Sequence, residues 1–432
     1  MKKLFKLFVL LMIAFSLASC NDKFPSISDT PQGKPVKPPI TVENIPDPTP
    51  LETKIDYLVN EQIQLGNIED ILEESGVVGE TAYLDYKPGI AYFLGFDKNR
   101  NLILIEDGTT FDLVSIPKKG NKKILVENIM DDRNRQIKFA IYQEPYLVWS
   151  ECPNAKTLPD PTDGSDWAVY LLNVETKKKT LIDYDQGLRV DAKYLHDYLC
   201  PMLLDIDGDY IVYPGFAKNT QNTIVPIIKT YQISTKEIKI IEELKSDLFH
   251  NALGAPSIYG NLITWPEAYI NEDATYDGFC VLYDLSTGEK KKILTPENVI
   301  NPTLTDGYLI ATNQPNVTFY DAEIVVLDLT DMTWKLKINS KFSIYSNSKY
   351  NPLYVSGCNE DFCTWDALMI DSLAFLDYRH QLLYHLIKKE EGHHVNHPII
   401  HNGNVLTWFE HVETENGLTP RLYYYYFKAF GQ

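Results

Sequence analysis

The chain has 432 residues and a formal net charge of −19, with 59 acidic residues against 40 Lys and Arg. A body of this charge is repelled by nucleic acid and by anionic lipid headgroups, and no basic patch or Arg-rich run opposes that tendency. The sequence therefore argues against a nucleic-acid partner.

The first twenty residues are typical of an export signal. Three lysines precede an apolar stretch that is too short to remain in a bilayer as a spanning helix. The following sequence, LASC at 17–20, resembles the lipobox of bacterial lipoproteins. That resemblance implies removal of residues 1–19 as a signal peptide and acylation of Cys20. It also implies an extracytoplasmic protein anchored in a membrane, at the cell surface or on the periplasmic face. The alternative is an ordinary secretory signal in which Cys20 has no role.

Two further segments precede the main domain. Residues 20–54 contain recurrent proline and few large apolar residues, which predicts a disordered tether that begins at the acylated Cys20. Residues 55–79 carry apolar side chains three and four apart, which predicts a short helical segment. The main domain is therefore expected to span residues 80–432.

From residue 80 onward, short β-rich runs alternate with Gly, Asn, Asp and Pro turns, and one pattern recurs. A copy reads PSIYGNLITW (256–265) and then FCVLYDLSTGEKKKIL (279–294), and a second reads PTLTDGYLIAT (302–312) and then EIVVLDLTDMTWKLKI (323–338). Four strands in each copy of about 40–50 residues is the content of a β-propeller blade. Six copies between 137 and 428 and a degenerate seventh at 81–126 predict an all-β fold. We expect a β-propeller of seven blades, with six as the alternative.

These repeats resemble the TolB-like and WD40-like propeller repeats of secreted bacterial proteins. In that family a Pro precedes a Ser/Asp-Gly turn, and a Y-D-L-x-T-G-E turn follows, as in YDLSTGE at 283–289. The inner turns of this chain depart from S-P-D-G, because they read Tyr259-Gly260-Asn261 and Asp306-Gly307. The resemblance implies a propeller over residues 80–428 and no single activity, since propellers host many unrelated functions.

The topology of a blade predicts which face binds. With strands lettered A to D from the axis outward, the B–C and D-to-A connections of every blade lie on one face, here called the B–C face. The predicted B–C connections are long and irregular, at 151–167, 214–226, 266–278, 313–322 and 410–420. Loop length concentrated on one face is typical of the binding face of a repeat protein. The alternative is that these segments are hydrophilic only because they are exposed.

Carboxylates and aromatic rings occur together on this predicted face, where they could hold a sugar, a cationic peptide or a cation. The candidate ligand residues are Asp166, Trp167, Glu267, Tyr269, Tyr276, Asp277, Asn301, Asn351, Glu410 and His411. The two asparagines are included because each precedes the Pro that opens a strand A, and so would lie at the mouth of the channel.

Four of the nine histidines fall in EGHHVNHPIIHNGNVLTW at 391–408. Most of this stretch is explained as a repeat copy in which Pro398 opens a strand. His393, His394 and His397 remain on the predicted B–C face, where neutral imidazoles could bind zinc, copper or nickel. Adjacent histidines often point apart, so we expect no cofactor, and a divalent metal at these three histidines is the alternative.

The sequence contains no recognisable catalytic motif, because G-x-S-x-G, a Walker-type loop, G-x-G-x-x-G and H-E-x-x-H are all missing. We therefore expect a lipid-anchored binding or protein-interaction module with an unknown protein, peptide or glycan ligand. The alternative is a propeller hydrolase or lyase acting on extracellular glycans, because paired carboxylates from different blades would leave no local motif.

Five cysteines follow Cys20, and an odd number leaves at least one of them unpaired. Cys358 and Cys363 flank a short polar turn. They could form a disulfide across one hairpin or remain free thiols.

Overall fold

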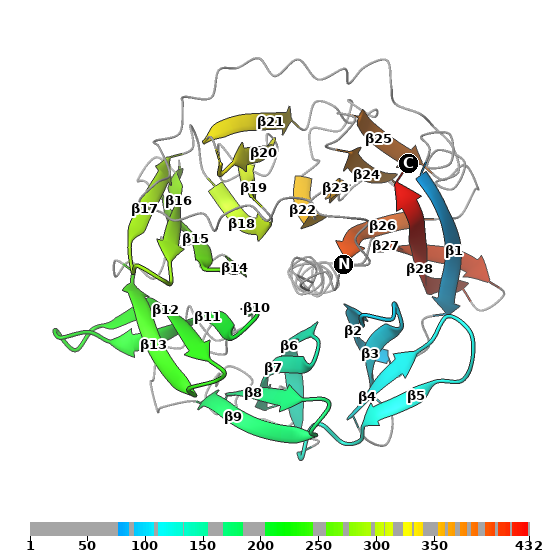
Figure 1. The fold of residues 1–432 in the computed structure, drawn as a ribbon, viewed down its shortest axis with the longest axis horizontal. Coiled ribbons are helices and arrows are strands. Elements are labelled where there is room, and N and C mark those ends of the chain that lie inside the picture. The colour runs from blue at the N-terminus through cyan, green and yellow to red at the C-terminus, as the bar shows by residue number, and fades with distance from the viewer. Residues whose placement is uncertain are drawn as a thin grey trace, which may run out of the picture.

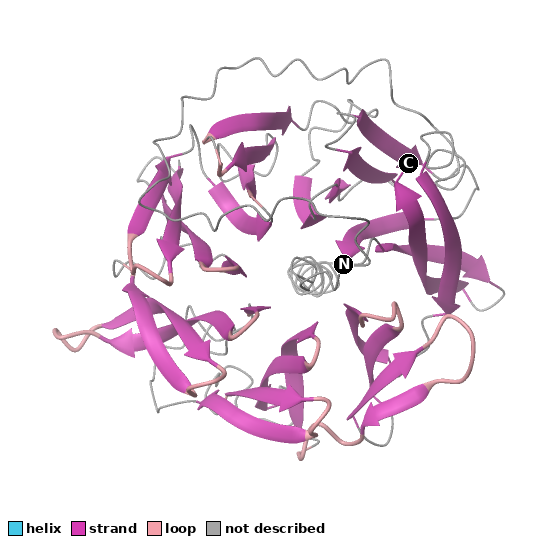
Figure 2. Ribbon diagram, viewed as in Figure 1, coloured by secondary structure: helices cyan, strands magenta, loops and turns pink. Residues whose placement is uncertain are grey.

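The computed structural model describes the chain from residue 77 onward, in segments. The described residues are 77–85, 90–107, 111–132, 134–153, 167–184, 204–244, 256–270, 276–294, 299–305, 307–313, 323–330, 332–339, 353–358, 362–367, 372–377, 382–387, 394–401, 405–414 and 417–430. Every regular element in these segments is a strand, which confirms the all-β class (Figure 2). A search of the same segments finds no helix that could cross a membrane.

The strands form seven four-stranded antiparallel sheets arranged as the blades of a ring (Figure 1). Blade 1 contains β2 (Ile90–Phe96), β3 (Leu102–Asp107), β4 (Phe111–Ile116) and β5 (Lys123–Val126), and blade 2 contains β6 (Arg135–Gln143), β7 (Tyr146–Pro153), β8 (Ala168–Asn173) and β9 (Lys178–Tyr184). Blade 3 contains β10 (Asp205–Asp207), β11 (Tyr210–Lys218), β12 (Ile224–Gln232) and β13 (Glu237–Glu243), and blade 4 contains β14 (Ser257–Tyr259), β15 (Leu262–Ile270), β16 (Tyr276–Asp284) and β17 (Lys290–Leu294). Blade 5 contains β18 (Val299–Thr305), β19 (Tyr308–Asn313), β20 (Glu323–Asp328) and β21 (Thr333–Asn339), and blade 6 contains β22 (Leu353–Cys358), β23 (Phe362–Ala367), β24 (Ser372–Asp377) and β25 (Leu382–Ile387). Blade 7 contains β26 (His394–His401), β27 (Val405–Thr414), β28 (Gly417–Phe430) and β1 (Val77–Asp85). This confirms the propeller fold, and the number of sheets agrees with the seven-blade count.

Blade 7 is assembled from both ends of the chain. Its sheet order is β1-β28-β27-β26, so the first described strand is the outermost strand of the last blade. The sequence analysis placed 81–85 in the first repeat copy, and the structure corrects this assignment. The predicted start of the main domain at residue 80 is also late, because β1 already begins at Val77. The remainder of the predicted helical segment, the tether and the signal peptide lie outside the described residues.

Where the structure describes side chains, apolar residues fill the interfaces between successive blades from blade 7 through blades 1, 2, 3 and 4 to blade 5. The aromatic residues predicted to end the second strand of several blades are core residues, since Trp149, Tyr213 and Trp265 are each 0% exposed. Where blade 7 meets blade 1, Tyr424 and Tyr426 pack edge-on against Phe96. Tyr424, Tyr425 and Tyr426 are buried, and the half-buried Tyr423 stacks on Trp408, so the tyrosines of β28 pack against the protein on both sides of the strand.

Polar groups link neighbouring innermost strands around the channel. The Asp205 carboxylate of β10 accepts hydrogen bonds from the backbone N–H of Ile206 (2.8 Å) and from that of Ile258 in β14 (2.7 Å). The hydroxyl of Ser257 accepts one from the N–H of Leu304 in β18 (3.0 Å). These bonds link the innermost strands of blades 3, 4 and 5 in sequence.

The turns between strands A and B contain two residues in blades 2, 3 and 4, whereas five residues separate the paired strands in blade 1. Gly208 and Gly260 lie in two of these turns with φ of 56° and 58°, a left-handed conformation that glycine adopts without strain. The predicted short and regular turns on this face are thus present in blades 3 and 4.

Three of the predicted long B–C loops are mostly strand in the structure. In blades 3, 4 and 7 the flanking strands continue as paired hairpins, with Lys218 opposite Ile224, Ile270 opposite Tyr276 and Thr414 opposite Gly417. Most of 214–226, 266–278 and 410–420 is therefore strand, and the prediction of irregular loops there was wrong. The central parts of 151–167 and 313–322 lie outside the described residues.

Candidate functional site

Alternation along the strands determines which candidate ligand residues share a side of a sheet. In blade 4, Tyr269 is directly opposite Asp277, and Glu267 is two residues before Tyr269 on the same strand. These three positions therefore lie on one side of the blade 4 sheet, while Tyr276, opposite Ile270, lies on the other. In blade 7, Glu410 and His411 are consecutive residues of β27, so their positions lie on opposite sides of that sheet.

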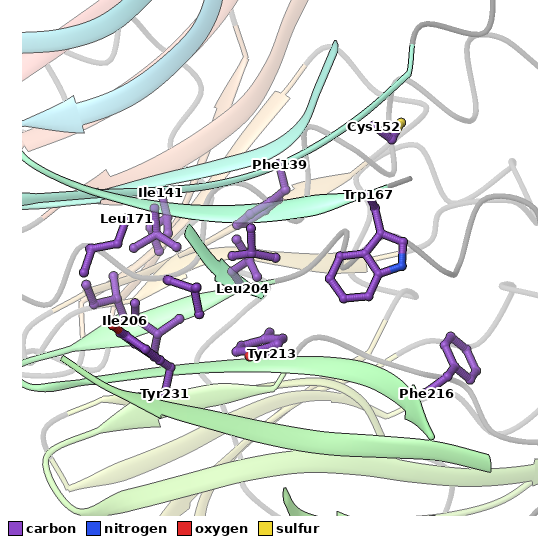
Figure 3. Packing of buried hydrophobic residues seen from close by; sticks show 14 residues of the cluster. Phe139, Ile141, Cys152, Trp167, Leu171, Leu204, Ile206, Tyr213, Phe216 and Tyr231 are labelled. Carbon is purple, nitrogen blue, oxygen red and sulfur yellow. The ribbon is translucent and has the colours of Figure 1, made fainter. Parts of the chain in front are cut away.

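The other candidate residues are distributed as follows. Trp167 is only 7% exposed and belongs to the core between blades 2 and 3, so it is not an exposed ligand residue (Figure 3). Asn301 lies in β18, within an irregularity of its pairing with β19. Asp166 and Asn351 lie outside the described residues.

Two of the three histidines predicted to bind a metal lie in β26 of blade 7. His394 opens β26 directly opposite His411 of β27, and His397 falls in an irregularity of that pairing, between Asn396 and Ile399. His393 lies outside the described residues. Across the segments that the structure describes, no group of three or more His, Cys, Asp or Glu is placed to hold a metal ion. A metal site at the three histidines stays a prediction.

A repeated Trp-x-Glu pattern was missed by the sequence analysis. In blade 2 the indole N–H of Trp149 donates to Oε2 of Glu151 (3.1 Å), and in blade 4 that of Trp265 donates to Oε1 of Glu267 (3.2 Å). Blade 7 has the same residue types at Trp408 and Glu410. Residues two apart on a strand share one side of the sheet, so each carboxylate lies toward the B–C end from a buried indole. Alignment of the repeat copies would have revealed this pattern.

In blade 2 the carboxylate of this pattern, Glu151, forms an ion pair with an arginine. Nε of Arg135, at the start of the innermost strand β6, donates to Oε1 of Glu151 (2.8 Å). The two side chains are 13% and 4% exposed. A charge-assisted pair with so little solvent contact holds both groups in fixed positions. Glu151 is therefore a structural anchor of the B–C face.

Blade 3 departs from the pattern, and a buried cluster results. At the position of the glutamate it has Gly215, where an added Cβ would lie 3.3 Å from Cε of Lys229. Nζ of Lys229 instead donates to Oδ2 of Asp183, on β9 of blade 2, at 2.7 Å. The side chains of this pair are 8% and 2% exposed. The glycine makes room for a lysine, and the carboxylate comes from the neighbouring blade.

Aromatic residues enclose this ion pair. The hydroxyl of Tyr213 donates to the same Asp183 oxygen (3.1 Å), and the rings of Tyr213 and Trp167 each lie 5.9 Å from Nζ of Lys229. Figure 3 shows Trp167 and Tyr213 between the strands of blades 2 and 3. Burial, followed by the charge of Asp183, raises the pKa of Tyr213 well above its ordinary value of 10.0. The phenol therefore stays protonated as a donor at neutral pH.

This raised pKa predicts a loss of stability in alkali. As pH passes about 10, the unfolded chain releases the Tyr213 proton before the folded chain does, so the contribution present below pH 10 is lost on further increase. The limiting slope for one such group is about 1.4 kcal/mol per pH unit. We expect the free energy of unfolding to fall less steeply above pH 10 in Tyr213→Phe than in wild type. Urea unfolding at a series of pH values measures this, and identical slopes would contradict it.

Comparisons with known proteins place the fold but not the activity. No described protein family matches the chain, and no curated protein does. Solved structures similar to it include TolB from Acinetobacter baumannii, at 12% identity over 74% of this chain and 67% of that one, with a TM-score of 0.40. The β-propeller domain of the Trilobed protease from Pyrococcus furiosus is 9% identical over 79% and 99%, with a TM-score of 0.48. An oligogalacturonate lyase solved in complex with manganese is 9% identical over 81% and 98%, with a TM-score of 0.48.

These likenesses concern the fold alone. The strand order of the chain is that of a β-propeller, and TolB is among the structures similar to it. Propellers with different activities appear side by side among these structures, so function has to be argued from the residues of this chain.

Proposed function

We propose that the chain is a lipid-anchored, extracytoplasmic binding protein of the bacterial envelope, attached through Cys20, which binds a basic segment of another protein on its B–C face. The observation that carries this proposal is the register of the blade 4 hairpin. It brings Glu267, Tyr269 and Asp277 to one side of a sheet. Positions on paired strands are held more rigidly than positions on loops, which lowers the entropic cost of binding.

Charge supports a cationic ligand. The net charge of −19 becomes −22 if the signal peptide with its three lysines is removed. Carboxylates beside an aromatic ring attract ammonium and guanidinium groups, through Coulomb attraction and through the ring face. A neutral or anionic glycan would gain nothing from Coulomb attraction to these carboxylates.

Binding is favoured over the alternative of a glycan hydrolase or lyase. General acid–base catalysis needs carboxylates that can exchange protons with a substrate. Glu151 and Asp183 both accept hydrogen bonds from a cation and from an aromatic donor, and both are buried. Such carboxylates support the architecture of the face rather than a reaction on it.

The binding proposal is tested with an oligolysine peptide as the probe. We expect wild-type protein to bind it, with an affinity that falls as salt rises. The double variant Glu267→Gln/Asp277→Asn removes two charges from one side of the blade 4 sheet and keeps similar shapes. It should weaken binding about tenfold, as measured by titration calorimetry at low ionic strength.

A matched control removes two exposed carboxylates from the opposite face. Glu175 and Glu289 lie in the C–D turns of blades 2 and 4. Glu175→Gln/Glu289→Gln changes the net charge equally, so it should weaken binding by about twofold at most. Equal weakening of binding by the two double variants would show a general charge effect and would contradict specific binding at the B–C face. Turnover of an oligosaccharide by wild-type protein would instead support the enzyme alternative.

A further inference from the structure

The inner hairpin of blade 6 contains two cysteines in register. Strands β22 and β23 pair from Leu353 opposite Ala367 to Cys358 opposite Cys363. The two cysteines are thus the last residues paired before the turn. The four residues between them have the sequence NEDF. The corresponding A–B turns of blades 2, 3, 4 and 5 connect their strands through two residues.

The backbone pairing satisfies the distance requirement of a disulfide. Directly opposite residues on antiparallel strands have Cα atoms about 5.5 Å apart in a hydrogen-bonded pair and about 4.5 Å apart in the other kind. Disulfides form between Cα atoms roughly 4.4–6.8 Å apart. Both kinds of pair fall within this range, and opposite residues share one side of the sheet. From this juxtaposition we infer that Cys358 and Cys363 form a disulfide once the protein meets a thiol oxidant.

The other described cysteines have no such partner. Cys152 is opposite Gln136 in blade 2, and Cys280 is opposite Pro266 and Ile293 in blade 4. Both are buried, and neither forms a disulfide. Burial raises the pKa of the Cys280 thiol, which further lowers its reactivity because the thiolate is the reacting form. Cys200 lies outside the described residues.

The oxidation is a two-electron exchange. The thiolate of one cysteine attacks a disulfide of a thiol–disulfide oxidoreductase or of oxidised glutathione, and a mixed disulfide forms as one oxidant thiolate leaves. The second cysteine displaces the other oxidant sulfur, so the S–S bond forms, the oxidant becomes two thiols, and the two thiol protons end on those products. Formation of this disulfide in cells rests on the proposed extracytoplasmic location of the protein, because the cytoplasm keeps thiols reduced.

The longer turn of blade 6 gives the bond a physical role. A four-residue connection has more conformations to lose than a two-residue turn, so it closes at a higher entropic cost. A covalent link between the residues that flank it removes those conformations from the unfolded chain. The bond would fix the inner hairpin of blade 6 on the face opposite the proposed binding face.

Peptide mapping of full-length protein recovered from the bacterial envelope tests the inference. The protein is denatured without reductant, alkylated and digested. We expect a cross-linked peptide two hydrogens lighter than the sum of the two thiol peptides, and alkylation of Cys152, Cys200 and Cys280. Alkylation of both Cys358 and Cys363 in this sample, or no bond after incubation with oxidised glutathione, would overturn the inference. If the protein remains in the cytoplasm with free thiols but forms the bond in oxidised glutathione, the proposed location fails while the pairing stands.

Stability provides a second measurement. The double variant Cys358→Ser/Cys363→Ser should melt about 2–5 °C below the oxidised wild type. Reductant should lower the melting temperature of wild type to a similar value and leave that of the variant unchanged. A wild-type melting temperature that does not respond to reductant would count against the bond.

Discussion

Replacing Lys229 with Met should lower the free energy of unfolding by about 3–5 kcal/mol, because Asp183 then remains buried with its charge unpaired. Asp183→Asn should cost a similar amount, since it leaves the Lys229 ammonium without its partner. The two side chains are 8% and 2% exposed and join blades 2 and 3 at 2.7 Å. Chemical denaturation at neutral pH measures both variants.

The double variant Lys229→Met/Asp183→Asn separates the charge effect from the packing effect. Neither charge is then left in the interface, and the Asn amide oxygen can still accept from the Tyr213 hydroxyl. The double variant should therefore be more stable than either single variant. As a control, Lys122→Met removes an ion pair to Glu106 whose lysine is 45% exposed, and it should cost about 1 kcal/mol or less. Additive costs of the two single changes at Lys229 and Asp183 would show that the pair is not coupled.

Removal of β1 should abolish the native ring. The strand pairs with β28 along its whole length, from Val77 opposite Phe430 to Asp85 opposite Arg421. A chain that begins at residue 90 would expose the edge of β28, and an exposed long edge with aromatic side chains favours aggregation. We expect loss of the cooperative thermal transition and of the peak of the full-length protein in size-exclusion chromatography. A chain that lacks only residues 21–54 is the control, and it should melt as the full-length chain does.

A finer version tests the hydrogen-bond ladder alone. Successive N–H groups of an edge strand point alternately toward the partner strand and toward solvent. Thr81 and Ala82 are opposite Tyr425 and Tyr424. Of the variants Thr81→Pro and Ala82→Pro, one should therefore lower the melting temperature much more than the other. Equal melting temperatures for both would mean that β1 adds little through this ladder.

The fold could be predicted because each blade repeats its own local pattern. Turns such as Tyr259-Gly260-Asn261 and buried second-strand aromatics such as Trp265 recur in successive repeat copies, so one blade predicts the next. The origin of blade 7 could not be predicted in this way. The pairing of Thr81 with Tyr425 joins positions 344 residues apart, and no local pattern encodes which edge a distant strand will join.

The candidate site was only partly predictable for a related reason. Pro266 and the acidic residues after it are typical of loops, yet the pairing of Pro266 with Cys280 continues outward to Ile270 and Tyr276. Pro is tolerated in such a strand where its missing N–H faces away from the partner. Trp167 was misplaced because a polar segment precedes it, although its ring lies in the core between two blades.

Blade 7 combines the first described strand with the last three, and this also limits the order in which the blades can form. A chain that is exported or synthesised from its N-terminus presents β1 long before β28 exists. Blades 1 to 6 have all four strands available earlier, whereas the ring can close only after the last strand has arrived. Contacts at such sequence separation form late, because the entropy of closing the loop is lost before the contact stabilises anything. Until then β1 has no partner strand, and its open edge is exposed to pairing with other chains.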